Sequence, residues 1–311
     1  MPSSRTSAAD PLDDPLTWGL ERKIRTGARG AVQDRQVAAG QGWRVLDVVC
    51  TCGPGDRRYQ EEHAWASVSL VLSGTFSYRN RQGPLLMSPG AWLLGQPGSS
   101  FECSHEHGEG DRCLSFQFDT ALFERLAHDS GSSPGVLARA RLPPLRALAP
   151  LAARAAATLN GAPDSLEEIG LELAGAVLRL ASHDPRGDRP VTTARDRGRI
   201  ARLLRQLEFT ADQPHALADL ARDAGLSRYH FLRTFKEATG ITPHQWLLRA
   251  RLREAARRLV DTPAPVTEIA LAVGFHDLSN FIRSFRSEFG RSPTRFRASR
   301  ASRPDPAGWA R

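Results

Sequence analysis

Residues 43–119 form short apolar runs separated by glycine and proline. Apolar runs of this length, bounded by turn-forming residues, predict strands. They occupy residues 45–50, 67–79, 84–98 and 113–119. Short strands at this regular spacing predict a small β-sandwich or barrel.

After Asp119 the apolar residues follow a helical rhythm. Helices are predicted over 121–130, 143–161 and 165–184. The third begins with a capping box, in which Ser165 is followed three residues later by Glu168. Its apolar residues recur at i, i+3 and i+4, which is typical of a helix that covers the sheet of its own domain.

One pattern occurs twice in the C-terminal third, within residues 217–297. Each copy has a short helix, a glycine that permits a tight turn, and a second helix opened by an N-cap residue, which is the layout of a helix-turn-helix. The second turn is expected to be one residue longer, because the glycine and the first of the two phenylalanines in the following helix are six residues apart in the first copy (Gly225 to Phe231) and seven in the second (Gly274 to Phe281). The copies match at an offset of fifty residues, in the pairs Phe231/Phe281, Arg233/Arg283, Phe235/Phe285, Gly240/Gly290 and Pro243/Pro293.

The second copy also contains an apolar-Ala pair, Gly-Phe, three spaced phenylalanines and Gly-x-Ser-Pro. These residues are Ile269, Ala270, Gly274, Phe275, Phe281, Phe285, Phe289, Gly290, Ser292 and Pro293. With this pattern the chain resembles the AraC/XylS transcription regulators, over roughly its last hundred residues. Residues 73–76 and 87–90 are similar to turns of the cupin-like sensor domain that many of these regulators carry.

The resemblance implies two domains, a mainly β N-terminal domain of cupin-like jelly-roll fold with added helices and an all-α double helix-turn-helix domain. A long helix opened by Thr242 and Pro243 is expected to connect the two units, which in relatives enter major-groove segments about one helical turn (~34 Å) apart. We expect a tail and lead-in over 1–40, a sensor and dimerisation domain over 41–182, a linker over 183–194, a DNA-binding domain over 195–299 with units at 215–240 and 266–290, and a tail over 300–311.

The charge is divided unevenly between these regions. Residues 191–311 contain 22 Lys+Arg and 12 Asp+Glu, a net of +10, whereas the preceding residues contain 20 and 22, a net of −2. A basic domain is expected where phosphate contacts supply affinity for nucleic acid. A solvated basic face without a partner is the alternative.

Double-stranded DNA is therefore the expected partner, read by the second helix of each unit. The resemblance places base contacts on Tyr229, Leu232 and Arg233, and Asn280 is suited to pair with adenine. For any single arginine, a phosphate contact is the alternative to base readout. The candidate DNA-binding residues are Arg228, Tyr229, Leu232, Arg233, Lys236, Leu278, Asn280, Ile282, Arg283 and Arg286.

All four cysteines lie in the N-terminal region, near histidines. In an extended strand, residues two apart point to the same side, so Cys103, His105 and His107 can share a face. Thiolate and imidazole suit zinc or another borderline-soft metal. The candidate ligands are Cys103, His105, His107 and Cys113, with Cys50, Cys52 and His63 as further donors. Packing cysteines beside a solvent-exposed histidine loop are the alternative.

Together these features predict a sequence-specific transcription regulator controlled by a small ligand, metal or redox signal of unknown identity. A cupin-type metalloenzyme is the alternative, although the chain lacks that family's usual metal motif and no catalytic residues are assigned. The resemblance implies RNA polymerase as a partner and allows a homodimer. We predict no membrane span or signal peptide, and a cytoplasmic protein.

Overall fold

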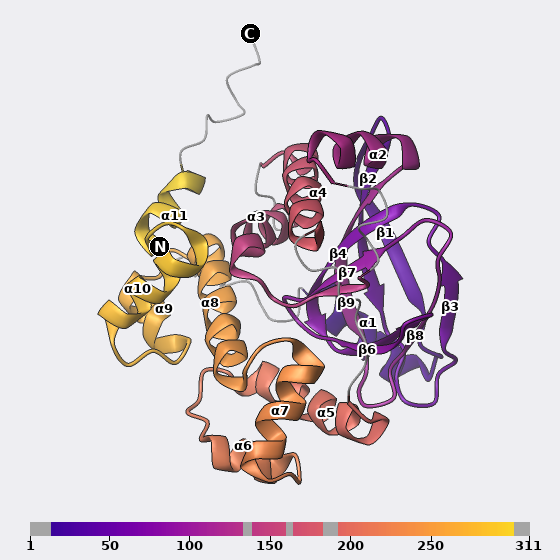
Figure 1. The fold of residues 1–311 in the computed structure, drawn as a ribbon. Helices are drawn as coiled ribbons and strands as arrows, with labels where there is room; N and C mark the ends of the chain where they lie inside the picture. The colour runs from indigo at the N-terminus through magenta and orange to yellow at the C-terminus, as the bar shows by residue number, and fades with distance from the viewer. Residues whose placement is uncertain (1–13, 133–138, 160–163, 183–191, 302–311) are drawn as a thin grey trace, which may run out of the picture.

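The computed structural model describes residues 14–132, 139–159, 164–182 and 192–301 (Figure 1). In these residues a two-sheet sandwich with added helices packs against a bundle of seven helices. The predicted fold class is thereby confirmed. None of the described helices combines the length and apolar character that a membrane span needs.

Two antiparallel sheets form the sandwich. The six-stranded sheet has the order β1 (Val32–Gly40), β2 (Trp43–Cys50), β9 (Asp111–Phe118), β4 (Ala66–Gly74), β7 (Trp92–Gly95) and β10 (Arg141–Leu142). The four-stranded sheet has the order β3 (Tyr59–Glu62), β8 (Ser100–Ser104), β5 (Phe76–Asn80) and β6 (Gly83–Met87). The register of β2 on β9 sets Cys50 directly opposite Asp111.

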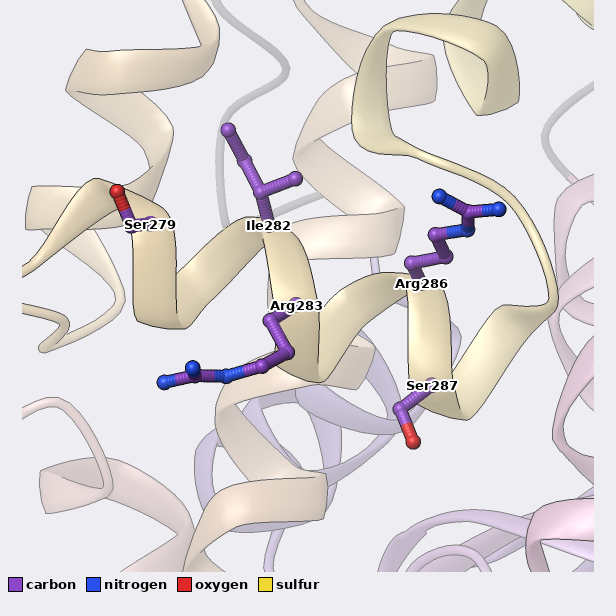
Figure 2. Close-up of a pocket in the computed structure, with 5 residues that line it drawn as sticks. All are labelled: Ser279, Ile282, Arg283, Arg286 and Ser287. Carbon is purple, nitrogen blue, oxygen red and sulfur yellow. The ribbon is translucent and has the colours of Figure 1, made fainter.

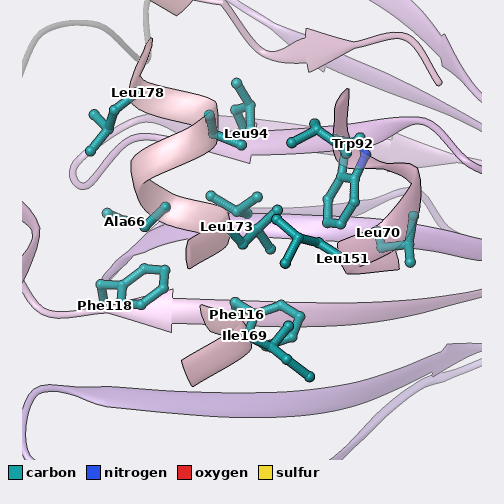
Figure 3. Close-up of a cluster of buried hydrophobic side chains, with 14 of the residues drawn as sticks. Ala66, Leu70, Trp92, Leu94, Phe116, Phe118, Leu151, Ile169, Leu173 and Leu178 are labelled. Atoms are coloured by element: carbon teal, nitrogen blue, oxygen red, sulfur yellow. The ribbon is translucent and has the colours of Figure 1, made fainter. Parts of the chain in front are cut away.

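Alternating side chains of the six-stranded sheet enter two different cores. Val68 and Phe116 face helices on the outer side, whereas Val71 and Cys113 pack between the sheets. The outer helices are α2 (Thr120–Asp129), α3 (Ala149–Thr158) and α4 (Leu166–Ser182). Figure 3 shows Ile169, Leu173 and Leu178 of α4 packed on this face. The predicted apolar stripe of α4 is thus used within its own domain.

Several elements differ from the sequence prediction. The segment assigned to a tail and lead-in contains α1 (Pro15–Thr26) and β1, and Asp14 caps α1 by accepting a hydrogen bond from Thr17 N. The strands β3, β8 and β10 were not predicted. The helix predicted over 143–161 begins later, because residues 143–145 have no regular secondary structure and the short 3₁₀ helix η3 (Arg146–Leu148) precedes α3. Residues 183–191 of the predicted linker lie outside the described residues.

Residues 192–301 form seven helices. They are α5 (Ala194–Thr210), α6 (Leu217–Asp223), α7 (Arg228–Thr239), α8 (Pro243–Asp261), α9 (Val266–Ala272), α10 (Leu278–Phe289) and α11 (Pro293–Ala301). The connecting helix α8 contributes Trp246 to the core of the first unit and Leu252 to the core of the second. Residues 224–227 separate α6 from α7 and residues 273–277 separate α9 from α10, so the second turn is one residue longer, as predicted.

The two regions contact each other directly. Figure 1 shows α3 between the sandwich and the helical region, where it contacts α8 and α10. At the other end of the interface, α5 packs on the sandwich. There Gly74 N donates a 3.1 Å hydrogen bond to Glu208, and Arg205 donates to the backbone oxygen atoms of Glu109 and Gly110.

Candidate functional site

The solvent-exposed face of helix α7 carries both polar and apolar side chains. Its N-cap Ser227 accepts a hydrogen bond from His230 N, and Gly240 ends it in the left-handed conformation. Phe231 and Phe235 are fully buried, and this fixes the face that points outward. All five predicted residues lie on that exposed face: Arg228, Tyr229, Leu232, Arg233 and Lys236.

The helix α10 repeats this arrangement. Asp277 caps it through Ser279 N, Phe281 and Phe285 are buried, and Gly290 ends it with a positive φ. The predicted residues are again exposed: Leu278, Asn280, Ile282, Arg283 and Arg286. Figure 2 shows side chains that line an open hollow along this helix, from Ser279, Ile282, Arg283, Arg286 and Ser287.

Arginine side chains on both exposed faces are held by neighbours within the same helix. Arg233 Nε lies 2.9 Å from Glu237 Oε1, and this carboxylate raises the pKa of the guanidinium. Arg283 Nη2 lies 3.3 Å from Asn280 Oδ1. Both arrangements leave further guanidinium donors for a phosphate or a base edge.

A third arginine, Arg251 of α8, joins the two helix-turn-helix units. Its guanidinium donates to the backbone oxygen atoms of Ala211 at 2.6 Å, Gln213 at 2.8 Å and Gly274 at 2.9 Å. The first two follow α5 and the third lies in the turn of the second unit. One side chain therefore fixes the turn of the second unit against the first. Arg251 was not among the predicted residues, because its partners are backbone atoms distant in sequence.

A different group of polar side chains lies at one end of the sandwich. Cys50 Sγ is 3.9 Å from His105 Nδ1, and His105 Nε2 is 2.6 Å from Asp111 Oδ1. All three residues are buried, and one ligand atom from each lies within 4.8 Å of the others. Cys113 Sγ donates to the second oxygen of Asp111 at 3.4 Å. Asp111 was not among the predicted ligands, because only the pairing of β2 with β9 brings it to Cys50.

Part of the predicted metal ligand set is separated from this group. The strand β8 ends at Ser104, so the extended geometry that would align His105 with His107 ends there. His107 instead packs against Gly198 of α5, where an added Cβ would overlap its ring. His63 Nε2 lies 3.0 Å from the Tyr78 hydroxyl, and burial lowers the pKa of His63 to about 4.

The thiols in this region are held in their neutral form. Burial raises the pKa of Cys50, Cys52, Cys103 and Cys113, and the Asp111 carboxylate adds to the effect on each of them. Thiolates, and not thiols, are the species that oxidants attack. The environment therefore disfavours rapid thiol oxidation unless a cation compensates the negative charge.

Comparison with known proteins assigns both regions. A model described as an AraC-like ligand binding domain matches residues 46–174, and a model described as a helix-turn-helix domain matches residues 220–299. The first model agrees with the sandwich fold of the N-terminal region. The second agrees with the exposed faces of α7 and α10 in the C-terminal region. Neither model describes an enzyme, so the cupin-type metalloenzyme alternative gains nothing from them.

The similar proteins match through the C-terminal region. The transcriptional activator NphR of Rhodococcus sp. is 39% identical over 106 residues, which is 34% of this chain and 31% of that protein. The Tn10 TetD protein of Escherichia coli is 35% identical over 98 residues, which is 32% of this chain and 71% of that protein. The chain thus spans about a third of the length of curated relatives such as NphR and LumQ.

Among solved structures, the DNA-binding domain of AdpA in complex with a target DNA is 33% identical, covering 34% of this chain and 96% of that chain with a TM-score of 0.33. The family assignment rests on the two domain matches and on TetD. The chain belongs to the AraC/XylS family of transcription regulators.

Proposed function

We propose that this chain is a sequence-specific DNA-binding regulator of transcription whose N-terminal domain responds to a small ligand, metal or redox signal. The observation that carries the proposal is the repeated exposed face of the two recognition helices. At the fifty-residue offset, Leu232 matches Ile282, Arg233 matches Arg283, and Lys236 matches Arg286, and every member of these pairs is exposed. The net charge of +10 in the same region favours a polyanionic partner.

The chemistry of the matched pairs suggests how each helix reads DNA. Arginine is suited to bond guanine O6 and N7 through two donors, and an apolar side chain is suited to contact a thymine methyl group. Tyr229 stands where the second helix has Ser279, and the second turn is one residue longer. We therefore infer that each monomer binds an asymmetric site made of two different half-sites.

Further partners are proposed from family membership. RNA polymerase is the proposed protein partner at promoters. A homodimer would bring two asymmetric sites together, but the apolar stripe of α4 cannot supply its interface because Ile169, Leu173 and Val177 are buried in the domain's own core. Sedimentation of the purified chain at micromolar concentration tests the dimer, and a purely monomeric species would exclude it under those conditions.

Selection of bound fragments from random double-stranded DNA tests the DNA-binding proposal. We expect enrichment of two unlike motifs at a spacing of about one helical turn (roughly 10 base pairs). The affinity for the selected fragment should exceed that for a shuffled fragment by at least about 1,000-fold at physiological salt. Equal affinity for both fragments would contradict sequence-specific binding.

A further inference from the structure

One small cavity at the end of the sandwich is lined by an unusual concentration of metal-binding side chains. Cys50, Cys52, Cys103 and His105 all line it. Its volume is about 10 Å³, close to the smallest space that one water-sized species can occupy. Pockets for organic ligands are typically 300 Å³ or larger, so the size favours a single ion.

The spacing of Cys50 and His105 fits a tetrahedral metal ion. Two ligand atoms bound at about 2.3 Å for sulfur and about 2.0 Å for nitrogen lie roughly 3.5 Å apart at the tetrahedral angle. Cys50 Sγ and His105 Nδ1 are 3.9 Å apart. Only a small movement would therefore bring both atoms to one ion.

Asp111 orients the histidine for this role. Its carboxylate lies 2.6 Å from Nε2 of His105, so Nε2 carries the proton and Nδ1 presents its lone pair to Cys50. A carboxylate behind a ligating imidazole is the usual way in which proteins fix the tautomer and orientation of a metal-bound histidine. Asp111 also accepts a hydrogen bond from Cys113 at 3.4 Å, which occupies its second oxygen.

We propose that Cys50, Cys52, Cys103 and His105 bind one thiophilic cation of the Zn²⁺ class, and that this ion is the signal to which the N-terminal domain responds. Among the described residues, the three ligand atoms within 4.8 Å of one another belong to Cys50, His105 and Asp111. The thiols of Cys52 and Cys103, which line the same cavity, therefore move inward when they bind the ion. Three thiolates and one imidazole form a standard zinc ligand set. Each thiol releases its proton to solvent when it binds the metal. Asp111 and Cys113 remain outside the coordination sphere as positioning residues.

The proposal that the bound ion acts as a signal rests on the proposed function and on the turn that carries His105. Residues 105–110 form the surface on which α5 packs, because Arg205 donates to the backbone oxygen atoms of Glu109 and Gly110. His107 in the same turn packs against Gly198 of α5. A cation that fixes His105 therefore also fixes the contact between the sandwich and the first helix of the DNA-binding region.

The metal site is tested first on the unmodified full-length chain. Protein stripped with a chelator and reloaded should bind one Zn²⁺ per chain, and Co²⁺ should give the absorption of a tetrahedral thiolate complex. X-ray absorption of the zinc form should show three sulfur atoms at about 2.3 Å and one nitrogen atom at about 2.0 Å. Binding of less than about one tenth of an ion per chain, or a shell of only nitrogen and oxygen, would overturn the proposal.

Variants then test which of these residues bind the ion. Cys50→Ser and His105→Ala should each lose the tetrahedral cobalt spectrum, and Asp111→Asn should weaken zinc binding by about 10–100-fold. His107→Ala is the matched control and should retain one ion and the same spectrum. Loss of binding in His107→Ala with retention in Cys50→Ser would overturn the ligand assignment. If the cysteine variants do not fold, the X-ray absorption result on the unmodified chain decides.

The signalling role is tested separately, with the selected DNA fragment. Metal-free and zinc-loaded protein should differ in affinity by at least about fivefold. Equal affinities would overturn the role of the ion as signal. If neither form distinguishes the selected fragment from a shuffled one while zinc still binds, the metal site stands, and the proposed function and the signalling role fail together.

Discussion

Arg233 and Arg283 occupy equivalent positions of α7 and α10, yet each is held by a different neighbour. Arg233 pairs with the Glu237 carboxylate at 2.9 Å, whereas Arg283 bonds the neutral Asn280 side chain at 3.3 Å. A carboxylate beside the DNA repels phosphate and must share its arginine with the ligand. The two recognition helices therefore differ in electrostatics as well as in shape.

Replacing either arginine tests base readout. Arg233→Ala and Arg283→Ala should each reduce the affinity for the selected DNA by about 1–3 kcal/mol if the guanidinium groups bond bases. Fluorescence anisotropy on selected and shuffled fragments, at several salt concentrations, separates the two modes. An equal loss on both fragments, with a reduced salt slope, would show that the arginines contact only phosphate.

The turn of the second unit depends on a glycine. Gly274 has a φ of +87°, and a Cβ at this position would overlap the backbone oxygen of Asp212. Gly290 has a φ of +75° but open space around the same position. Gly290→Ala should therefore cost only about 1–2 kcal/mol of unfolding free energy, and Gly274→Ala should cost about 1–3 kcal/mol more. Urea unfolding of both variants measures the difference, and equal losses would contradict the steric argument.

The buried carboxyl of Glu208 links stability to pH. Burial raises its pKa above 4.5, although Gly74 N and nearby arginines oppose the shift. The folded chain therefore binds this proton more tightly than the unfolded chain, so stability falls as pH rises from 4.5 through the raised pKa. Glu208→Gln keeps an acceptor for Gly74 N and removes the ionisation.

Urea unfolding at pH 5 and pH 7 checks this expectation. Between the two values the variant should lose less unfolding free energy than the unmodified chain. Glu124→Gln, at an exposed position of α2, is the matched control and should behave like the unmodified chain. The expectation is wrong if Glu208→Gln loses more stability than the unmodified chain over the same interval.

The helical region was predictable because its signals are local. Phenylalanines four residues apart, N-caps and glycines at helix ends all act within one or two turns, and α7, α8 and α10 begin at the expected caps. The strands β3 and β8 were missed because they are short and partly polar, and their stability comes from pairing with each other and with β5. Such pairing between strands distant in sequence cannot be predicted from the residues of either strand alone.

The thiol–histidine group was predictable only in part. Cys103 and His105 are close in sequence, but Cys50 is 55 residues from its neighbour His105. Asp111 reaches the same place through the pairing of β2 and β9. His107 was assigned to the group on the assumption of a continuous strand, whereas the chain turns after Ser104 and directs His107 to α5.

Arg251 gives a test of how the two units act together. Its hydrogen bonds to Ala211, Gln213 and Gly274 hold the second turn against the first unit. Arg251→Lys keeps the charge, but a single ammonium group cannot reproduce the planar fork that reaches three carbonyl oxygens. The variant should therefore bind a fragment with only one half-site as the unmodified chain does.

The two half-sites joined at the selected spacing should give a different result. Loosening the link between the units lowers the effective concentration of the second unit once the first has bound. We expect the affinity of Arg251→Lys for the joined site to fall by about 1–2 kcal/mol, within the range of measured coupling energies. Anisotropy measurements on both fragments decide the matter. An equal loss on the single half-site would instead assign Arg251 to the stability of one unit, or to direct contact with DNA.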